Sequence, residues 1–368
     1  MEAISSIIWN DDFWLPEGFT WKDLDLEMTP GGIRHPQFSD LYYVPIIALV
    51  LLLIRIIFER FIALPFCVYL GITNTTSKYE QNAICEKVFK EVTANPNKEH
   101  IDGLIKQLGW SQGRVQRWFR KRRKANQLPL LKKATESCWR CVFYFWLFCF
   151  GGYTILPTDW FYDTRQWMIG YIREQDFNNY MRSYYLMELG FYFSLLFSQF
   201  IDAKRKDFWQ MFIHHIVTIA LIFSSFAISH CRIGVVIMFI HDASDFWLEG
   251  AKVFNYAKIQ KVCDGLFVMF ALTFFITRWV YYPFWVLEAF IFKVPELIGP
   301  WKGHWLECTW LIILQILHFY WGGLIVHMVY KLLTQGKVDR DTRSEDESSG
   351  DETPTQPTTS AAVNKKKK

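Results

Sequence analysis

Long apolar runs alternate with shorter polar connections along most of this chain. Each run has at least the roughly 17 residues that a helix needs to cross the hydrocarbon core of a bilayer. The runs predict seven transmembrane helices, at about 41–64, 139–156, 184–201, 208–228, 233–250, 265–292 and 306–333. The pattern therefore predicts an all-α polytopic membrane protein.

One long stretch, residues 65–131, interrupts this apolar pattern with charged and amphipathic sequence. Residues 82–127, broken by Asn-Pro-Asn at 95–97, predict two or three short helices. The run Val115 to Arg123 resembles the recognition helix of a homeodomain, but Lys121 stands where that pattern has an adenine-binding asparagine. We therefore predict a small cytosolic, helical, homeobox-like insert. Its basic charge suits a membrane surface or a nucleotide-bearing substrate, and DNA binding is the less favoured interpretation.

Composition and charge add an orientation. The chain is 51% hydrophobic and 18% aromatic, more aromatic surface than a soluble fold of this size buries. Lysine and arginine cluster in the predicted connections 65–137, 202–207, 251–261 and 331–343, and the alternate connections carry at most two such residues each. The positive-inside rule then places the N-terminal segment 1–40 on the luminal side and the C-terminus in the cytosol. The sequon Asn74-Thr75-Thr76 would face the cytosol and stay unmodified.

The eight cysteines lack the paired spacing of a zinc site and the framework of a small secreted domain. Cys138 and Cys141 form a C-x-x-C at the start of an apolar run. We predict lipid-facing packing for this pair.

Two consecutive predicted spans contain polar groups that are costly at membrane depth. These groups are His214, His215, His241, Asp242, Asp245, Glu249 and Lys252. His214 follows Asp207 by seven residues, and Asp245 precedes Lys252 by seven, so each lies about 10 Å from the cytosolic end of its helix. Because a very short turn joins the two helices, both polar sets should lie at one level on antiparallel neighbours.

Histidine beside a carboxylate is the usual arrangement for a general base, so His214 or His215 could act with Asp242 or Asp245. Histidine and aspartate also bind metals, but the histidine boxes of membrane di-iron hydroxylases are not found in this sequence. We rank catalysis above a metal site, and a metal site above structural packing. The remaining intramembrane polar residues look isolated; they are His318, His327 and Arg278. Arg278 could neutralise a pocket carboxylate or be structural.

Three stretches of this sequence together resemble the Lag1 motif of the ceramide synthases. They are the run from Lys204 to Phe208, the pair His214-His215, and His241-Asp242-x-x-Asp245 with Glu249-x-x-Lys252. This motif lies in the larger TLC domain, which would span residues 132–336. The insert ahead of it and an acidic, serine-containing tail behind it are also similar to the animal members of this family.

The resemblance implies N-acylation of a sphingoid base by a fatty acyl-CoA in the endoplasmic reticulum membrane. His214, His215, Asp242 and Asp245 would be catalytic, with histidine as general base or as an acyl-accepting nucleophile; the sequence does not choose between these routes. Acyl-CoA is then a co-substrate, and no cofactor or metal is implied. Substrate-binding residues would be Lys204, Arg205, Lys206, His241, Glu249, Lys252 and Arg278. The connection 293–305 resembles the family element that influences acyl-chain length.

The family also implies dimers with itself or with related synthases. We expect the tail, residues 337–368, to be disordered by composition and to carry serines in an acidophilic kinase pattern. Its four terminal lysines resemble a dilysine retrieval signal. Three rival hypotheses remain: a non-catalytic TLC-domain protein for lipid transport or sensing, a seven-span receptor, and a membrane-tethered transcription regulator.

Overall fold

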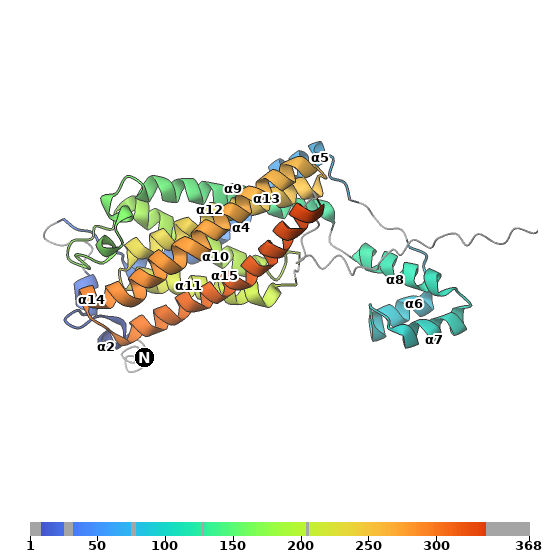
Figure 1. Cartoon of the computed structure of the whole chain (residues 1–368), viewed down its shortest axis with the longest axis horizontal. Coiled ribbons are helices and arrows are strands. Elements are labelled where there is room, and N and C mark those ends of the chain that lie inside the picture. The colour runs from blue at the N-terminus through green and yellow to red at the C-terminus, as the bar shows by residue number, and fades with distance from the viewer. Residues whose placement is uncertain (1–8, 26–31, 75–78, 127–128, 204–205, 336–368) are drawn as a thin grey trace, which may run out of the picture.

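A computed structural model describes residues 9–25, 32–74, 79–126, 129–203 and 206–335, and within these ranges every regular element is helical. Figure 1 shows an elongated bundle with a small helical unit beyond one end. The long bundle segments are α4 with η2 and α5 (Tyr43–Phe58, Glu59–Ala63, Leu64–Tyr69), α9 (Leu130–Ile155), α10 (Asn179–Ser198), α11 (Phe208–Ala227), α12 (Cys231–Tyr256), α13 with η6, η7 and α14 (Gln260–Phe274, Phe275–Leu287, Ala289–Lys293, Val294–Ile298) and α15 (Lys302–Gln335). Short elements are α2 (Asp11–Trp14), α3 (Trp21–Leu24), η1 (Phe38–Tyr42), η4 (Asp159–Tyr162) and η5 (Thr164–Trp167).

Four of these helical segments in the described chain are long and apolar enough to cross a membrane: Phe38–Tyr69, Phe208–Ala227, Gln260–Ile298 and Lys302–Thr334. This confirms an all-helical, multi-pass membrane protein. The other three long helices, α9, α10 and α12, carry more polar residues. Helix α12 packs against α9, α10, α11, α13 and η6, so most of its polar side chains are buried by protein.

Several helix boundaries differ from the predicted ones. Helix α9 begins at Leu130, nine residues before the predicted Trp139, because Thr135, Glu136 and Ser137 are buried against neighbouring helices and continue it. The predicted connection 293–305 is mostly helical and is reduced to residues 299–301 between α14 and α15. Gly299 makes that sharp turn with φ of 84°, a conformation open to glycine at little cost.

The polar insert folds into three short helical parts, as two or three were predicted. They are α6 with η3 (Ala83–Lys87, Val88–Val92), α7 (Lys98–Leu108) and α8 (Gln112–Asn126). The parts share a small core of Cys85, Ile101, Leu104, Val115, Trp118 and Phe119. The exposed residues Arg117, Arg120 and Lys121 lie on α8 away from this core.

An ion pair joins the ends of the insert, because Arg122 Nη2 on α8 lies 2.8 Å from Glu86 Oε1 on α6. This guanidinium lowers the pKa of Glu86 to about 2, well below its usual range. The pair therefore stabilises the insert fully above the ordinary carboxyl pKa, and its contribution is lost as the pH falls toward 2.

We expect Glu86→Gln to loosen the insert at neutral pH, because Arg122 loses its charged partner. Hydrogen exchange of amides in α7 and α8 should speed up a few-fold in the detergent-solubilised full chain. Glu99→Gln, an exposed change on α7, is the matched control. Equal exchange in wild type and Glu86→Gln near pH 7 would show that the pair does not support the insert.

The C-x-x-C pair does not face lipid in the way predicted. Cys138 is buried, and its sulfur lies 3.7 Å from that of Cys67 on α5. Cys141 is half-buried and donates to the carbonyl of Phe246 on α12. These small side chains therefore lie at contacts between helices. The prediction failed because apolar periodicity alone does not distinguish lipid from a neighbouring helix.

Candidate active site

A narrow, mostly apolar cavity lies in the bundle between α11, α12 and α15. His214 and His241 line it, and so do His230 and Glu307. Between these polar groups the walls are aliphatic: Leu221, Ile222, Ile233, Ile237, Met238, Leu311 and Leu314. The shape and lining suit an alkyl chain with a reactive group at one end.

A histidine pair joins α12 to α15 beside this cavity. His241 Nε2 lies 3.0 Å from His318 Nε2, and His241 Nδ1 lies 2.6 Å from the carbonyl of Ile237. A neutral His241 that donates from Nδ1 must accept at Nε2, so His318 donates from its Nε2; this tautomer follows from the hydrogen-bond network. His318 is therefore not isolated, contrary to the sequence prediction, because α15 packs against α12 only in the folded bundle.

Arg278 ties the same part of α12 to η6. Its guanidinium donates to the His241 carbonyl at 2.9 Å and to Asp245 Oδ1 at 2.8 Å, and it also contacts the Ser244 hydroxyl. Arg278 therefore pairs with Asp245, one of the carboxylates that the sequence analysis assigned to the site. It lies in a segment with widened, i→i+5 helical bonding around Pro283, a geometry frequent at functional sites.

The two neighbouring histidines of α11 have different surroundings. His214 lines the cavity, within electrostatic range of His241 and Arg278. Its ring packs edge-on against Trp321 of α15, whose indole nitrogen donates to the buried Asp207 at 3.1 Å. His215 is turned toward α10, where its Nδ1 lies 2.8 Å from Gln199 Oε1. Only His214 of the two therefore faces the cavity.

The two predicted aspartates, Asp242 and Asp245, also contact different partners. Asp242 accepts a hydrogen bond from Tyr184 on α10 at 3.2 Å and interacts with Glu188, which is fully buried. Asp245, four residues on from His241, pairs with Arg278. Among the described residues neither His214 nor His215 is hydrogen-bonded to either aspartate. The predicted direct histidine–carboxylate dyad is thus not formed by these pairs.

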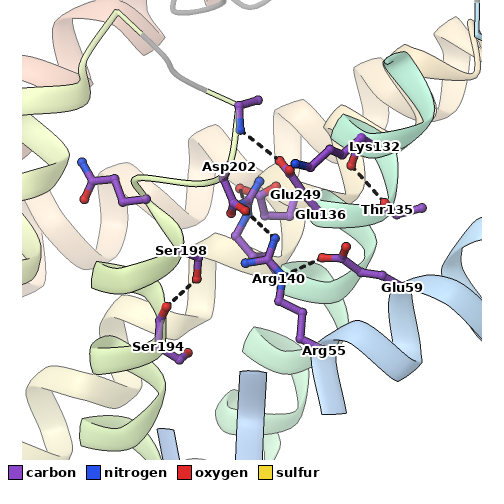
Figure 2. Close-up of polar contacts among 12 residues, drawn as sticks. Arg55, Glu59, Lys132, Thr135, Glu136, Arg140, Ser194, Ser198, Asp202 and Glu249 are labelled. Carbon is purple, nitrogen blue, oxygen red and sulfur yellow. Dashed lines mark hydrogen bonds and ion pairs between the residues drawn. The ribbon is translucent and has the colours of Figure 1, made fainter. Parts of the chain in front are cut away.

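Glu249 and Lys252 belong to a second polar group, toward the C-terminal end of α12. Lys252 Nζ lies 2.6 Å from Glu249 Oε1, and Arg140 Nε lies 3.4 Å from the same oxygen. Figure 2 shows Glu249 and Arg140 of this group together with Asp202, which lies 3.2 Å from Arg140 Nη1 and 2.7 Å from Arg55 Nη2. Arg55 Nε also lies 2.6 Å from Glu59 Oε1, one helical turn further along the chain.

This charged network links α4, α9, α12 and the loop that precedes α11. Of the predicted basic run, Lys206 is exposed, and Lys204 and Arg205 lie outside the described residues. Arg55 is buried, so its ion pairs lie within the protein.

Asp202→Asn should destabilise the protein by about 2–3 kcal/mol, because Arg55 and Arg140 would each lose a charged partner in a largely buried place. Thermal unfolding in detergent would measure the change. The exposed Asp12, replaced by Asn, is the matched control. An unfolding temperature equal to that of wild type would contradict this role of Asp202.

Sequence reasoning missed several residues around the site. Tyr184 and Glu188 carry no local signal, since each is a single polar residue in an apolar or aromatic run, and His318 was named only as an isolated intramembrane residue. Asp207 was used only to measure depth. Within the described ranges, no group of three or more histidine, cysteine, aspartate or glutamate side chains converges to hold a metal ion.

Residues 133–327 match the family model of the TLC domain, which contains all the cavity residues named above. The chain is 44% identical to ceramide synthase 5 of Homo sapiens over 346 residues, 94% of this chain and 88% of the relative. It is 38% identical to ceramide synthase 4 of Mus musculus over 95% of this chain and 89% of the relative. It is 30% identical to ceramide synthase hyl-1 of Caenorhabditis elegans, over 92% and 84%. The fold and site thus define a membrane TLC-domain protein. The chain belongs to the ceramide synthase family.

Proposed function

We propose that this protein transfers a fatty acyl group from acyl-CoA to the amino group of a sphingoid base. One observation carries the proposal: an apolar cavity in the bundle has His214 and His241 at one end and aliphatic walls beyond them. That arrangement fits an acyl chain whose thioester lies at the histidines. Membership of the ceramide synthase family supplies the class of substrates.

In one route His214 acts as a general base. It takes a proton from the ammonium group of the sphingoid base, and the amine nitrogen attacks the thioester carbonyl. The nitrogen of the tetrahedral intermediate loses its second proton to water, and the intermediate expels the CoA thiolate, which receives the proton held by His214. In the other route a ring nitrogen of His214 attacks the thioester, CoA leaves, and the amine resolves the acyl-imidazole.

The neighbours of His214 hold this geometry. Trp321, anchored by Asp207, limits rotation of the His214 ring, and Arg278 anchors the turn of α12 that carries His241. The linked His241 and His318 share a hydrogen bond whose direction is fixed by the Ile237 carbonyl. His215 acts through Gln199, and Asp242 through Tyr184 and Glu188, as positioning groups in this proposal.

We place the protein in the endoplasmic reticulum membrane with seven spans, a luminal N-terminus and a cytosolic C-terminus. The distribution of lysine and arginine supports this orientation, with the insert and the charged network of Figure 2 on the cytosolic side. The CoA moiety would stay in the cytosol while its chain enters the bundle. We propose that the homeobox-like insert contacts the membrane surface or the nucleotide-bearing substrate rather than binding DNA. We also propose that the protein forms dimers with a second copy of itself or with related synthases.

The test uses purified full-length protein with sphinganine and a panel of acyl-CoA thioesters. We expect amide product in equal amount to free CoA thiol. A well-folded protein that binds the lipids and forms no amide would instead support the transport or sensing alternative.

A further inference from the structure

A buried polar pair lies at the far end of the cavity from His214. His230, at the start of α12, has 1% of its surface exposed, and Glu307 of α15 has 2%. His230 Nδ1 lies 3.3 Å from Glu307 Oε2, and Ser224 of α11 donates to Glu307 Oε1 at 2.9 Å. Helices α11 and α15 and the residue that precedes Cys231 of α12 thus each contribute one polar side chain at this end.

The pair has hydrogen-bonding capacity left over. Among the described residues, no hydrogen-bond partner is found for either ring nitrogen of His230 or for Oε2 of Glu307. Both side chains line the cavity. Buried polar groups in proteins nearly always have partners, because an unmet one costs desolvation energy that nothing returns. These atoms therefore point to a ligand group that both donates and accepts.

Three aromatic rings pack around His230, and one of them, Phe290, also lines the cavity. The ring centroids of Tyr171, Trp301 and Phe290 lie 5.1, 5.3 and 6.0 Å from that of His230. The Tyr171 hydroxyl is used by the Ile228 carbonyl at 2.6 Å and does not serve the histidine. This packing fixes the imidazole against the end of the cavity, so a chain that fills the cavity meets it.

The cavity has a definite length. On each of the three helices, eleven residues separate the histidine end of the cavity from the end with the polar pair, which is about 16 Å of helix. The separations are His214 to Ser225 on α11, His230 to His241 on α12, and Glu307 to His318 on α15. An extended alkyl chain advances about 1.3 Å per carbon, because C–C bonds of about 1.5 Å meet at the tetrahedral angle. A chain of roughly a dozen carbons, with its thioester at His214, would thus bring its last carbon to the polar pair.

We propose that His230 and Glu307 form a subsite for a hydroxyl group on the terminal carbon of the acyl chain. The hydroxyl would donate to Glu307 Oε2 and accept from the protonated ring nitrogen of His230 that faces the cavity. A plain methyl end at the same place leaves both groups without a partner. A site built to bind a hydroxyl discriminates strongly against the analogue that lacks it. This inference rests on the proposed function, since it needs the acyl chain in this cavity.

The experiment compares dodecanoyl-, tetradecanoyl- and hexadecanoyl-CoA with their terminally hydroxylated counterparts, using the full-length enzyme and sphinganine. For the length that reaches the pair, wild type should use the hydroxylated thioester with a kcat/KM about tenfold above that of the plain one. His230→Phe keeps the ring packing and removes both nitrogens. Combined with Glu307→Gln, which keeps the Ser224 hydrogen bond, it should bring that ratio to about one or below.

Cys308→Ala, next to Glu307 but outside the cavity lining, is the matched control and should keep the wild-type ratio. A wild-type ratio at or below one for every length, or a ratio that the double variant does not change, would overturn the subsite. Protein that forms no amide from any thioester would instead contradict the proposed function. If the double variant does not fold, His230→Phe alone gives the same comparison.

Discussion

His214→Ala is expected to lower kcat for amide formation by about a thousandfold, because a positioned base or nucleophile supplies an effect of that size. His214 is the histidine of the adjacent pair that lines the cavity, whereas His215 is held by Gln199. Product formation from acyl-CoA and sphinganine measures the change. The exposed His327 of α15, replaced by alanine, is the matched control and should keep the wild-type rate.

A quenched reaction of the wild-type protein separates the two chemical routes. When wild type is mixed with acyl-CoA alone and quenched, an acyl group found on the peptide that contains His214 supports the covalent route. Amide formation without such an adduct supports the general-base route. A His214→Ala protein that is folded and nearly as active as wild type would remove His214 from both.

Local geometry explains how much of this site could be predicted. The short turn between α11 and α12 makes them antiparallel neighbours, and the rise of a helix per residue puts His214 and His241 at similar depth. The rotation of about 100° per residue separates Asp242 from Asp245. In the structure these two aspartates indeed face different partners, Tyr184 and Arg278.

The rest depends on packing between distant segments. His241 and His318 are 77 residues apart in the sequence, and Ser224 and Glu307 are 83 apart. No periodicity in one helix indicates which helix will lie opposite. A single histidine or glutamate near the end of an apolar run looks like an interfacial residue, so His230 and Glu307 gave no signal. The helices α9 and α12 also extend past the predicted ends, because protein contacts rather than lipid bury their polar residues.

Arg278→Met is expected to destabilise the protein by about 3 kcal/mol and to lower activity by a large factor. The guanidinium is buried and has Asp245 as its charged partner, so its removal leaves a carboxylate without a countercharge inside the bundle. Thermal unfolding in detergent measures the first effect and amide formation the second. Thr273→Val, one helix segment earlier and outside the site, is the control.

A double variant separates charge balance from positioning. In Arg278→Met with Asp245→Leu the unpaired charge is gone, so most of the lost stability should return. Activity should not return, because Arg278 also donates to the His241 carbonyl and contacts Ser244, and these contacts hold the turn of α12 that bears His241. Recovery of stability and activity together would mean that Arg278 only balances the charge of Asp245. Recovery of stability alone would identify Arg278 as a positioning residue for the histidine pair, since the fold would be intact while the geometry at His241 and His318 was lost.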